Sequence, residues 1–220
     1  MSLAYVADIE RPGPGHTLLH AAPMSHGSGL YALPHFAGGG LNRIPESGGF
    51  EPEEVFGAIG SNTRVSFFAA PTMVTRLLSS PKLGDADLRS LETIIYGGAP
   101  MYVADTLRAI DAFGPRLFNL YGQGECPMTI AGLPQSAHAD RDHPKFEARL
   151  ASCGLPRSGV EIRIVDEEGV DVAAGEVGEI AARSICTMTG YWQNAEATRA
   201  TIGDGWLHTG DLGVLDDDGF

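Results

Sequence analysis

Four short apolar runs organise the first two thirds of the chain, and each ends in small residues. The runs cover residues 18–23, 65–71, 94–100 and 117–122; the first three close on proline and the fourth on glycine. A continuous apolar run of this length, bounded by turn residues, predicts a buried strand followed by a tight exit.

Between these runs, apolar positions recur every three or four residues, which is the spacing of one helical face. The helical segments cover residues 52–59, 72–78 and 100–113. Strands and helices in alternation predict a parallel sheet with right-handed crossovers. Ligands of such sheets bind outside the carboxyl ends of the strands, so we expect the small-residue exits to line one crevice.

The pattern changes after the fourth run. Residues 133–152 are rich in Pro, His, Asp and Arg, and they predict a mobile polar loop. Two histidines and two aspartates within residues 138–143 leave a metal site as the alternative.

The last third of the chain has the period-two alternation of half-exposed strands. Residues 160–165 alternate clearly and residues 177–182 less so, and acidic turns that contain glycine separate such pieces. Residues 194–199 are the exception, because they read as a helix with Asn194 as its N-cap.

These patterns predict an α/β fold, with a mainly parallel sheet and flanking helices followed by a small antiparallel β subdomain. Residues 17–132 form the expected α/β subdomain, residues 133–152 the polar loop, and residues 153–220 the β-rich subdomain. Residues 1–16 are a polar stretch with proline and glycine, which reads either as a natural start or as a leader added in cloning.

Composition and charge narrow the classes of function. A hydrophobic content of 43% and a charged content of 20% are those of a globular protein. The net charge of −13, with Lys82 and Lys145 as the only lysines, argues against a nucleic-acid surface. No apolar run approaches the ~18 residues of a membrane span, and no signal peptide is visible. We therefore expect a cytoplasmic protein, and a homo-oligomer is compatible with the sequence.

The three cysteines are Cys126, Cys153 and Cys186. They are odd in number, widely spaced and without a CxxC pair, which indicates free thiols and no disulfide frame or zinc site. Cys126 directly follows Glu125, so it is either a nucleophile or a small side chain packed behind a loop. No base is placed beside it by the sequence, which favours the packing role.

The stretch from Leu120 to Glu125 combines an aromatic ring, two glycines and a carboxylate. Glycine allows a positive φ or a close approach of the backbone to a ligand. A carboxylate at such a bend suits a hard cation such as Mg²⁺ that substrate phosphates also hold. An ordinary turn after a strand is the alternative.

Tyr121-Gly122-Gln123-Gly124-Glu125 resembles the Tyr-Gly-x-Thr-Glu motif of the adenylate-forming superfamily. That superfamily comprises acyl- and aryl-CoA synthetases, the adenylation domains of peptide synthetases, and firefly luciferase. Residues 190–194 resemble its Gly-Tyr segment, and residues 205–211 resemble its Gly-Trp-x-x-Thr-Gly-Asp motif. Residues 97–100 and 23–27 resemble two more motifs, and all of them occur in the family's order.

The resemblance implies ATP, Mg²⁺ and coenzyme A as cofactors and a small-molecule carboxylic acid as the substrate. It implies that Glu125 holds Mg²⁺ against the phosphates as a catalytic residue, and that His26, the second catalytic candidate, lies at the mouth of an acyl pocket. Asp211 would accept hydrogen bonds from the ribose hydroxyls, and Tyr121 would lie against adenine. The other implied nucleotide-binding residues are Gly97, Gly98, Ala99, Pro100, Gly122, Gln123 and Gly124.

The residues around His26 favour a class of acid. Peptide-synthetase adenylation domains place an acidic residue in this segment to hold the substrate's amino group, and residues 23–30 contain none. A fatty or aryl acid without an α-amino group is therefore expected.

Three departures from the family pattern bear on activity. Gly124 stands where the family most often has threonine, and the Ser/Thr/Gly-rich phosphate loop that ends in Pro-Lys-Gly does not occur in the chain. The hinge and the small C-terminal domain with its catalytic lysine would follow Phe220. We therefore expect an internal fragment of the large N-terminal domain of an acyl-CoA synthetase, inactive by itself.

Three alternatives remain at this point. The chain could be a non-catalytic nucleotide- or acyl-binding module, or part of an adenylation enzyme with an acceptor other than CoA. The third is a generic α/β domain in which the motifs are coincidental.

Overall fold

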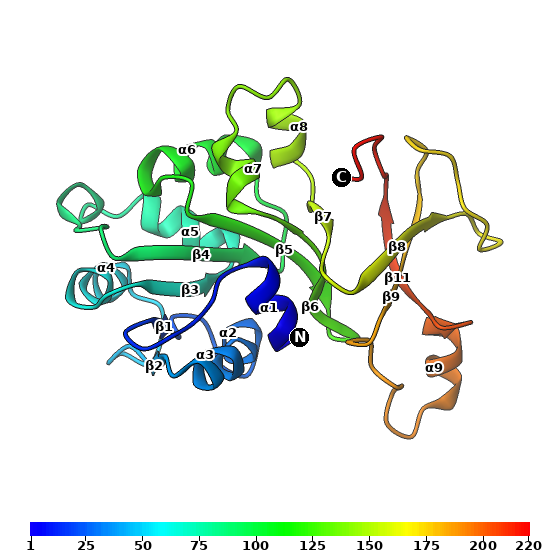
Figure 1. Cartoon of the computed structure of the whole chain (residues 1–220), viewed down its shortest axis with the longest axis horizontal. Coiled ribbons are helices and arrows are strands. Elements are labelled where there is room, and N and C mark those ends of the chain that lie inside the picture. The colour runs from blue at the N-terminus through cyan, green and yellow to red at the C-terminus, as the bar shows by residue number, and fades with distance from the viewer.

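The computed structural model describes residues 1–220, which form two sheets joined side by side (Figure 1). The larger sheet has the strand order β2-β1-β3-β4-β5-β6-β7. Its strands are β1 (Thr17–Leu19), β2 (Leu41–Arg43), β3 (Val65–Ala69), β4 (Leu91–Gly97), β5 (Leu117–Gln123), β6 (Cys126–Leu133) and β7 (Leu155–Pro156). Strands β1 to β5 pair in parallel, whereas β6 and β7 continue the sheet in antiparallel pairing.

Helices cover both faces of the larger sheet. They are α1 (Ser2–Asp8), α2 (Gly27–Leu30), α3 (Ala32–Gly38), α4 (Pro52–Ser61), α5 (Pro71–Leu78), α6 (Val103–Phe113), α7 (Gln135–Ala139) and α8 (Phe146–Leu150), with a 3₁₀ turn η1 (Leu83–Asp85). Buried residues of α4 to α8 belong to one hydrophobic cluster, and buried residues of α1 and of the α2–α3 junction belong to a second.

Side-chain alternation along the strands divides these two clusters. Phe67 and Ile94 pack in the first cluster, while their chain neighbours Phe68 and Ile95 pack in the second. Successive residues of a strand point to opposite faces, so a continuous apolar run is what a strand covered on both faces requires. This explains why the predicted runs show no polar alternation.

The smaller sheet is antiparallel, with the order β10-β11-β9-β8. Its elements are β8 (Val160–Val165), β9 (Gly178–Ser184), α9 (Ala195–Thr201), β10 (Ile202–Gly203) and β11 (Trp206–Gly213). Ala182 and Leu207 of this sheet pack against Cys126 and Ile130 of β6 in a third cluster. That contact fixes the small sheet beside the end of β5, which is where the candidate site lies.

The predicted fold class is confirmed, including the four strands, the antiparallel last third, and a helix that Asn194 caps through its side chain. Cys126 is fully buried and contacts Thr129 Oγ1 at 3.2 Å, in agreement with the packing role. Strand β6 was not predicted, although it follows β5 after a turn of only two residues.

Residues 1–16 differ from the expected leader, because they are part of the folded core. Helix α1 packs against α3, and Tyr5 is 1% exposed. The polar stretch therefore contains a short helix that buries Ala4 and Tyr5 and that its composition concealed.

Residues 133–152 also differ from the expected mobile loop, since they contain α7 and α8. His138 is buried and bonded to the Tyr96 hydroxyl at 3.0 Å and to the carbonyl of Pro134 at 2.9 Å. The only group of three metal-ligating side chains lies elsewhere, so the metal alternative for residues 138–143 is wrong.

None of the helices combines the length and the apolar character that crossing a membrane requires.

Candidate active site

Two adjoining cavities lie at the carboxyl ends of β4 and β5. The first, which we call the Asp211 cavity, has a volume of about 500 Å³, and the second, the His26 cavity, about 550 Å³. Four residues line both cavities: Gly98, Leu120, Gly122 and Gln123. The two spaces therefore share a wall at the predicted strand exits, as expected for a crevice at this edge of an α/β sheet.

Strand β5 presents three polar side chains to the Asp211 cavity. Asn119, Tyr121 and Gln123 all line it, as residues two apart on one face of a strand should. The last two were predicted from the motif. Asn119 was missed, although the period of two that relates it to Tyr121 was the signal that could have found it.

Asp211 reaches the same cavity from β11 of the small sheet. The hydroxyl of Tyr121 donates to Asp211 Oδ2 at 2.6 Å, and the Gln123 amide donates to the same oxygen at 2.9 Å. Burial, followed by the hydrogen bond to Asp211, raises the pKa of Tyr121 above its ordinary value, so the hydroxyl stays protonated as a donor. No protein group donates to Asp211 Oδ1, which leaves one carboxylate oxygen free to accept hydrogen bonds from a ligand.

The glycines at this edge of the sheet are required for two different physical reasons. A Cβ on Gly97 would lie 2.5 Å from the Leu120 carbonyl oxygen, and one on Gly122 would lie 2.5 Å from the Met128 nitrogen. These two glycines let neighbouring strands approach, and neither is replaceable without a shift. Gly98 instead has a φ of +82° and faces open space, so it turns the chain into the cavity. Ala99 and Pro100 follow it along the lining.

Glu125 sits in the two-residue turn between β5 and β6, outside the lining of both cavities. Its Oε1 accepts a hydrogen bond of 2.5 Å from the hydroxyl of Tyr191, and its carbonyl accepts one from the Met188 amide. This carboxylate is therefore held by the small sheet's segment at the rim of the site. A single carboxylate of this kind fits Mg²⁺, which proteins bind through one or two carboxylates together with substrate oxygens.

His26 lines the second cavity with largely apolar neighbours. It immediately precedes α2, and its ring centroid lies 6.4 Å from that of Phe68. The side chains of Met24, Leu30 and Met128 line the same cavity, and Gly124 lies on its rim. The arrangement suits an apolar organic group beside a single imidazole.

The structure thus brings together around one crevice nine of the eleven residues proposed from the sequence. They are Gly98, Ala99, Pro100, Tyr121, Gly122, Gln123 and Asp211 at the first cavity, and His26 and Gly124 at the second. Glu125 stands next to them in the turn, and Gly97 supports the wall without lining it. Ser152 and Cys153 line the Asp211 cavity but carried no signal in the sequence, because they enter through the α8 segment that read as a loop.

The family model described as "AMP-binding enzyme" matches residues 1–192. Over all 220 residues the chain is 35% identical to a medium/long-chain-fatty-acid–CoA ligase, FadD8, of Mycobacterium tuberculosis, of which it covers 37%. It is 32% identical over 204 residues to a feruloyl-CoA synthase of an Amycolatopsis species, a match that spans 92% of this chain and 39% of the relative. The chain thus spans somewhat more than a third of the length of these relatives.

Solved structures with a similar fold extend over nearly the whole of this chain. An amide bond synthetase, McbA from Marinactinospora thermotolerans, aligns with a TM-score of 0.88 and 35% identity over 99% of this chain and 43% of its own. MatB from Rhodopseudomonas palustris aligns with a TM-score of 0.81 and 28% identity, over 99% of this chain and 41% of its own.

Proposed function

Because the chain belongs to the AMP-binding enzyme family, we propose that the whole protein activates a carboxylic acid with ATP and transfers the acyl group to coenzyme A. The single observation that carries this proposal is the free carboxylate oxygen of Asp211, held beside Tyr121 in the cavity that adjoins the His26 cavity. One cavity suits a nucleoside and the other an apolar acid.

Asp211 binds the ribose in this proposal. Tyr121 and Gln123 fix Oδ2, so Oδ1 is oriented without further cost when the ribose hydroxyls donate to it. The ring of Tyr121 and the backbone from Gly98 to Pro100 offer a flat, side-chain-poor surface for the adenine base. These groups position ATP, and positioning supplies much of the rate in phosphoryl and nucleotidyl transfer.

Glu125 is the residue proposed to hold Mg²⁺. The metal ion, when bound, neutralises charge that develops on the phosphate oxygens as the carboxylate attacks. The role of this chain is to orient Glu125, which the hydroxyl of Tyr191 does from the loop between β9 and α9.

The acid occupies the His26 cavity in this proposal. Its apolar lining suits a hydrocarbon or aryl group and offers no carboxylate to pair with an amino group. The relatives named for medium- to long-chain fatty acids and for ferulate support the same two classes of acid. His26 lies at the border of this cavity, where an imidazole can contact the carboxyl end of the substrate.

The proposal is tested with the protein at its native length by acid-dependent ATP–pyrophosphate exchange and by the formation of an acyl-CoA thioester. A panel of fatty acids of increasing length and of hydroxycinnamic acids identifies the class of substrate. We expect Asp211→Ala to lower exchange about a hundredfold, while Asp204→Ala, which changes an exposed turn aspartate of the same sheet, keeps it. Exchange that is unchanged in Asp211→Ala contradicts the assignment.

An amine as the acyl acceptor is the second candidate, and the structural similarity to an amide bond synthetase favours it. Both candidates share the adenylation step, so the product separates them. Incubation of the protein with acid and ATP, with either CoA or a panel of primary amines, followed by mass spectrometry of the products, decides between thioester and amide.

The 220 residues alone are proposed to be inactive. The only lysines, Lys82 and Lys145, lie in neither cavity, so no lysine ammonium of this chain faces the triphosphate. Exchange activity of the isolated 220 residues would contradict this.

A further inference from the structure

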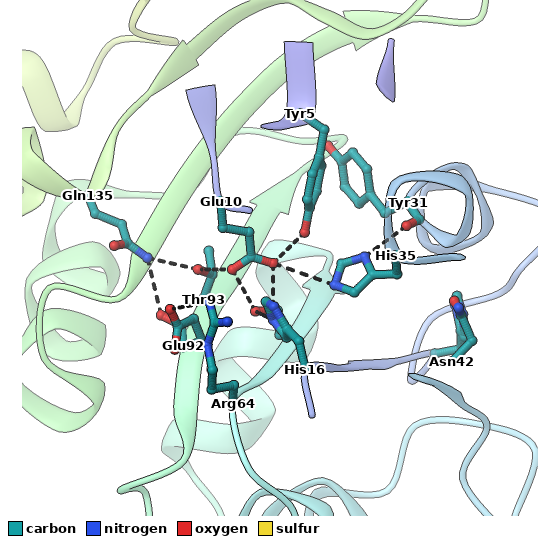
Figure 2. Close-up of polar contacts among 12 residues, drawn as sticks. Tyr5, Glu10, His16, Tyr31, His35, Asn42, Arg64, Glu92, Thr93 and Gln135 are labelled. Carbon is teal, nitrogen blue, oxygen red and sulfur yellow. Dashed lines mark hydrogen bonds and ion pairs between the residues drawn. The ribbon is translucent and has the colours of Figure 1, made fainter. Parts of the chain in front are cut away.

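A second group of metal-ligating side chains lies near the amino ends of the sheet's strands; Figure 2 shows these side chains and their polar contacts. It consists of Glu10, His16 and His35, which we call the Glu10 cluster. The histidine side chains are 0% exposed and the Glu10 side chain is 5% exposed. His16 precedes β1 and the neighbouring Ser66 is near the start of β3, so the cluster lies at the amino ends of the strands, away from both cavities.

Glu10 is a buried carboxylate without a cationic partner. Its oxygens accept hydrogen bonds from the hydroxyls of Tyr5, Ser66 and Thr93. No lysine or arginine pairs with it, and the cation drawn beside it, Arg64, pairs with Glu92 at 3.1 Å (Figure 2). Buried charges in proteins are normally paired or coordinate a metal, because desolvation is costly.

His35 is oriented to offer a lone pair to this carboxylate. Its Nδ1–H donates to the carbonyl of Tyr31 at 3.0 Å, which leaves Nε2 as the unprotonated nitrogen of a neutral ring. Its Nε2 has no hydrogen-bond partner and lies 3.7 Å from Glu10 Oε1, so two lone pairs face each other across a gap with no donor between them.

His16 completes the group from a third segment. Its Nε2 lies 3.4 Å from Glu10 Oε1 and 3.0 Å from Ser66 Oγ. Its Nδ1 is buried without a partner, so the hydrogen bonds around the ring do not fix its tautomer. The ligand atoms of the three side chains all lie within 4.8 Å of one another.

These separations are those of ligands around one small cation. Zinc binds imidazole nitrogen and carboxylate oxygen at about 2.0–2.2 Å, which places tetrahedral ligands about 3.3–3.5 Å apart. The 3.4 Å from His16 Nε2 to Glu10 Oε1 fits this spacing, whereas the 3.7 Å from His35 Nε2 exceeds it and the three ligand atoms spread over as much as 4.8 Å, so a bound ion would draw them slightly together. The hydroxyl of Ser66, 3.0 Å from His16 Nε2, lies where a fourth oxygen ligand can come from. The bond from His35 Nδ1 to a backbone carbonyl is the outer contact that orients metal-binding histidines.

The geometry points to a closed structural site in which Glu10, His16 and His35 bind one divalent transition-metal ion, with Zn²⁺ favoured by the two-histidine, one-carboxylate donor set. The ion supplies the positive charge that the buried carboxylate lacks. It also ties together the segment after α1, the start of β1 and helix α3, three pieces of chain that no disulfide joins.

The test uses the native-length protein with Cys153 and Cys186 replaced by serine, so that thiols do not bind the probe metals. After removal of metal with a chelator, Zn²⁺ and Co²⁺ are added. We expect one equivalent of tight Zn²⁺, the visible absorption of four-coordinate Co²⁺, and a rise in Tm of about 5 °C or more on saturation. Binding of no metal above the level of a buffer blank overturns the site.

His138→Gln is the matched control for His35→Gln. Both histidines are fully buried and bond the carbonyl four residues earlier, but Nε2 of His138 is already satisfied by the Tyr96 hydroxyl. We expect His35→Gln to lose the Co²⁺ absorption and at least tenfold in Zn²⁺ affinity. The Co²⁺ absorption and Zn²⁺ affinity of His138→Gln should equal those of the unsubstituted protein. Equal binding by the two variants overturns the assignment.

X-ray absorption on the Zn²⁺-loaded protein with all its histidines needs no folding of a variant. Two imidazoles and oxygen at about 2.0–2.2 Å support the site, whereas a shell of oxygens without imidazole contradicts it.

Discussion

The Asp211 cavity and the Glu10 cluster are each built around one carboxylate, and they differ in what surrounds it. Asp211 is exposed, accepts two hydrogen bonds on one oxygen, and leaves the other oxygen open to a cavity of about 500 Å³. Glu10 is buried, accepts three hydroxyl hydrogen bonds and faces two imidazoles. The first arrangement suits a ligand that binds and dissociates, such as a substrate, and the second suits a permanently bound ion.

This difference predicts where substitutions affect stability and where they affect activity. Removing a buried polar group leaves its partners without hydrogen bonds, whereas removing an exposed one lets water take its place. Substitutions in the Glu10 cluster should therefore lower the free energy of unfolding, and substitutions at the Asp211 cavity should lower activity while leaving stability nearly unchanged.

Glu10→Ala is expected to have the largest effect, a loss of about 3–5 kcal/mol in the free energy of unfolding, because three buried hydroxyls lose their acceptor. Urea unfolding measures it. Glu147→Ala, which truncates an exposed glutamate of α8, should change stability by less than about 0.5 kcal/mol. Equal effects of the two substitutions would show that the buried network contributes nothing.

The second prediction is that the free energy of unfolding falls at acidic pH because of a buried histidine, His138. Burial lowers the pKa of His138 to about 4, below its ordinary value of 6.5. The unfolded chain therefore binds a proton between pH 6.5 and pH 4 that the folded chain does not, so stability falls as the pH falls through this window. The contribution of His138 is on the order of 3 kcal/mol.

Urea unfolding between pH 7 and pH 4 checks this linkage. His138→Gln should be less stable than the unsubstituted protein at pH 7, with a smaller loss of stability on acidification. A variant that loses as much stability as the unsubstituted protein over this window would contradict the low pKa of His138.

The third prediction is that Asp211→Ala lowers activity and leaves stability nearly unchanged. Loss of a charged acceptor for the ribose costs about 3 kcal/mol or less, which corresponds to roughly a hundredfold in kcat/KM for ATP. The urea midpoint should stay within the range of a surface substitution. A large loss of stability with unchanged kinetics would reverse the roles assigned to the two carboxylates.

The sequence predicted the Asp211 cavity better than the Glu10 cluster for a physical reason. Tyr121, Gly122 and Gln123 are contiguous, and strand exits converge at one edge of any parallel sheet, so their neighbourhood follows from the fold class. The Glu10 cluster draws its members from a loop, a strand start and a helix, and only tertiary packing brings them together. In a polar stretch with two prolines between them, Glu10 and His16 carried no periodic signal.

Three further elements, α7, α8 and β6, were not predicted, for a different reason. Helices α7 and α8 have five residues each, too few for an apolar period to repeat. Strand β6 is buried from Met128 to Leu133 and follows its turn at once, so nothing marks it off from β5. The contact of Tyr191 with Glu125, across 66 positions, was likewise beyond local pattern.

Tyr191→Phe is expected to have an effect of about 1 kcal/mol, because it removes one hydrogen bond to a carboxylate at the rim of the site. With the hydroxyl gone, Glu125 is less well oriented, and the Mg²⁺ concentration at half-maximal exchange should rise about fivefold. Tyr102→Phe, which alters an exposed tyrosine outside both cavities, is the control. A lower Mg²⁺ requirement in Tyr191→Phe would mean that the hydroxyl competes with the metal and does not position its ligand.

Gly124→Thr should have the smallest effect. It restores the residue most often found in the family motif and tests whether the fold requires glycine at this position. A Cβ at Gly124 meets nothing within 4 Å, and its backbone φ is not in the left-handed region, so a side chain fits without strain. Stability should therefore change by less than about 0.5 kcal/mol. The hydroxyl adds a donor on the rim of the His26 cavity, and we expect kcat for exchange to rise by a few fold, as one neutral hydrogen bond allows. Gly124→Val has the same shape without the hydroxyl and should not raise kcat, whereas equal rates for the two variants would show that the hydroxyl contributes nothing at this rim.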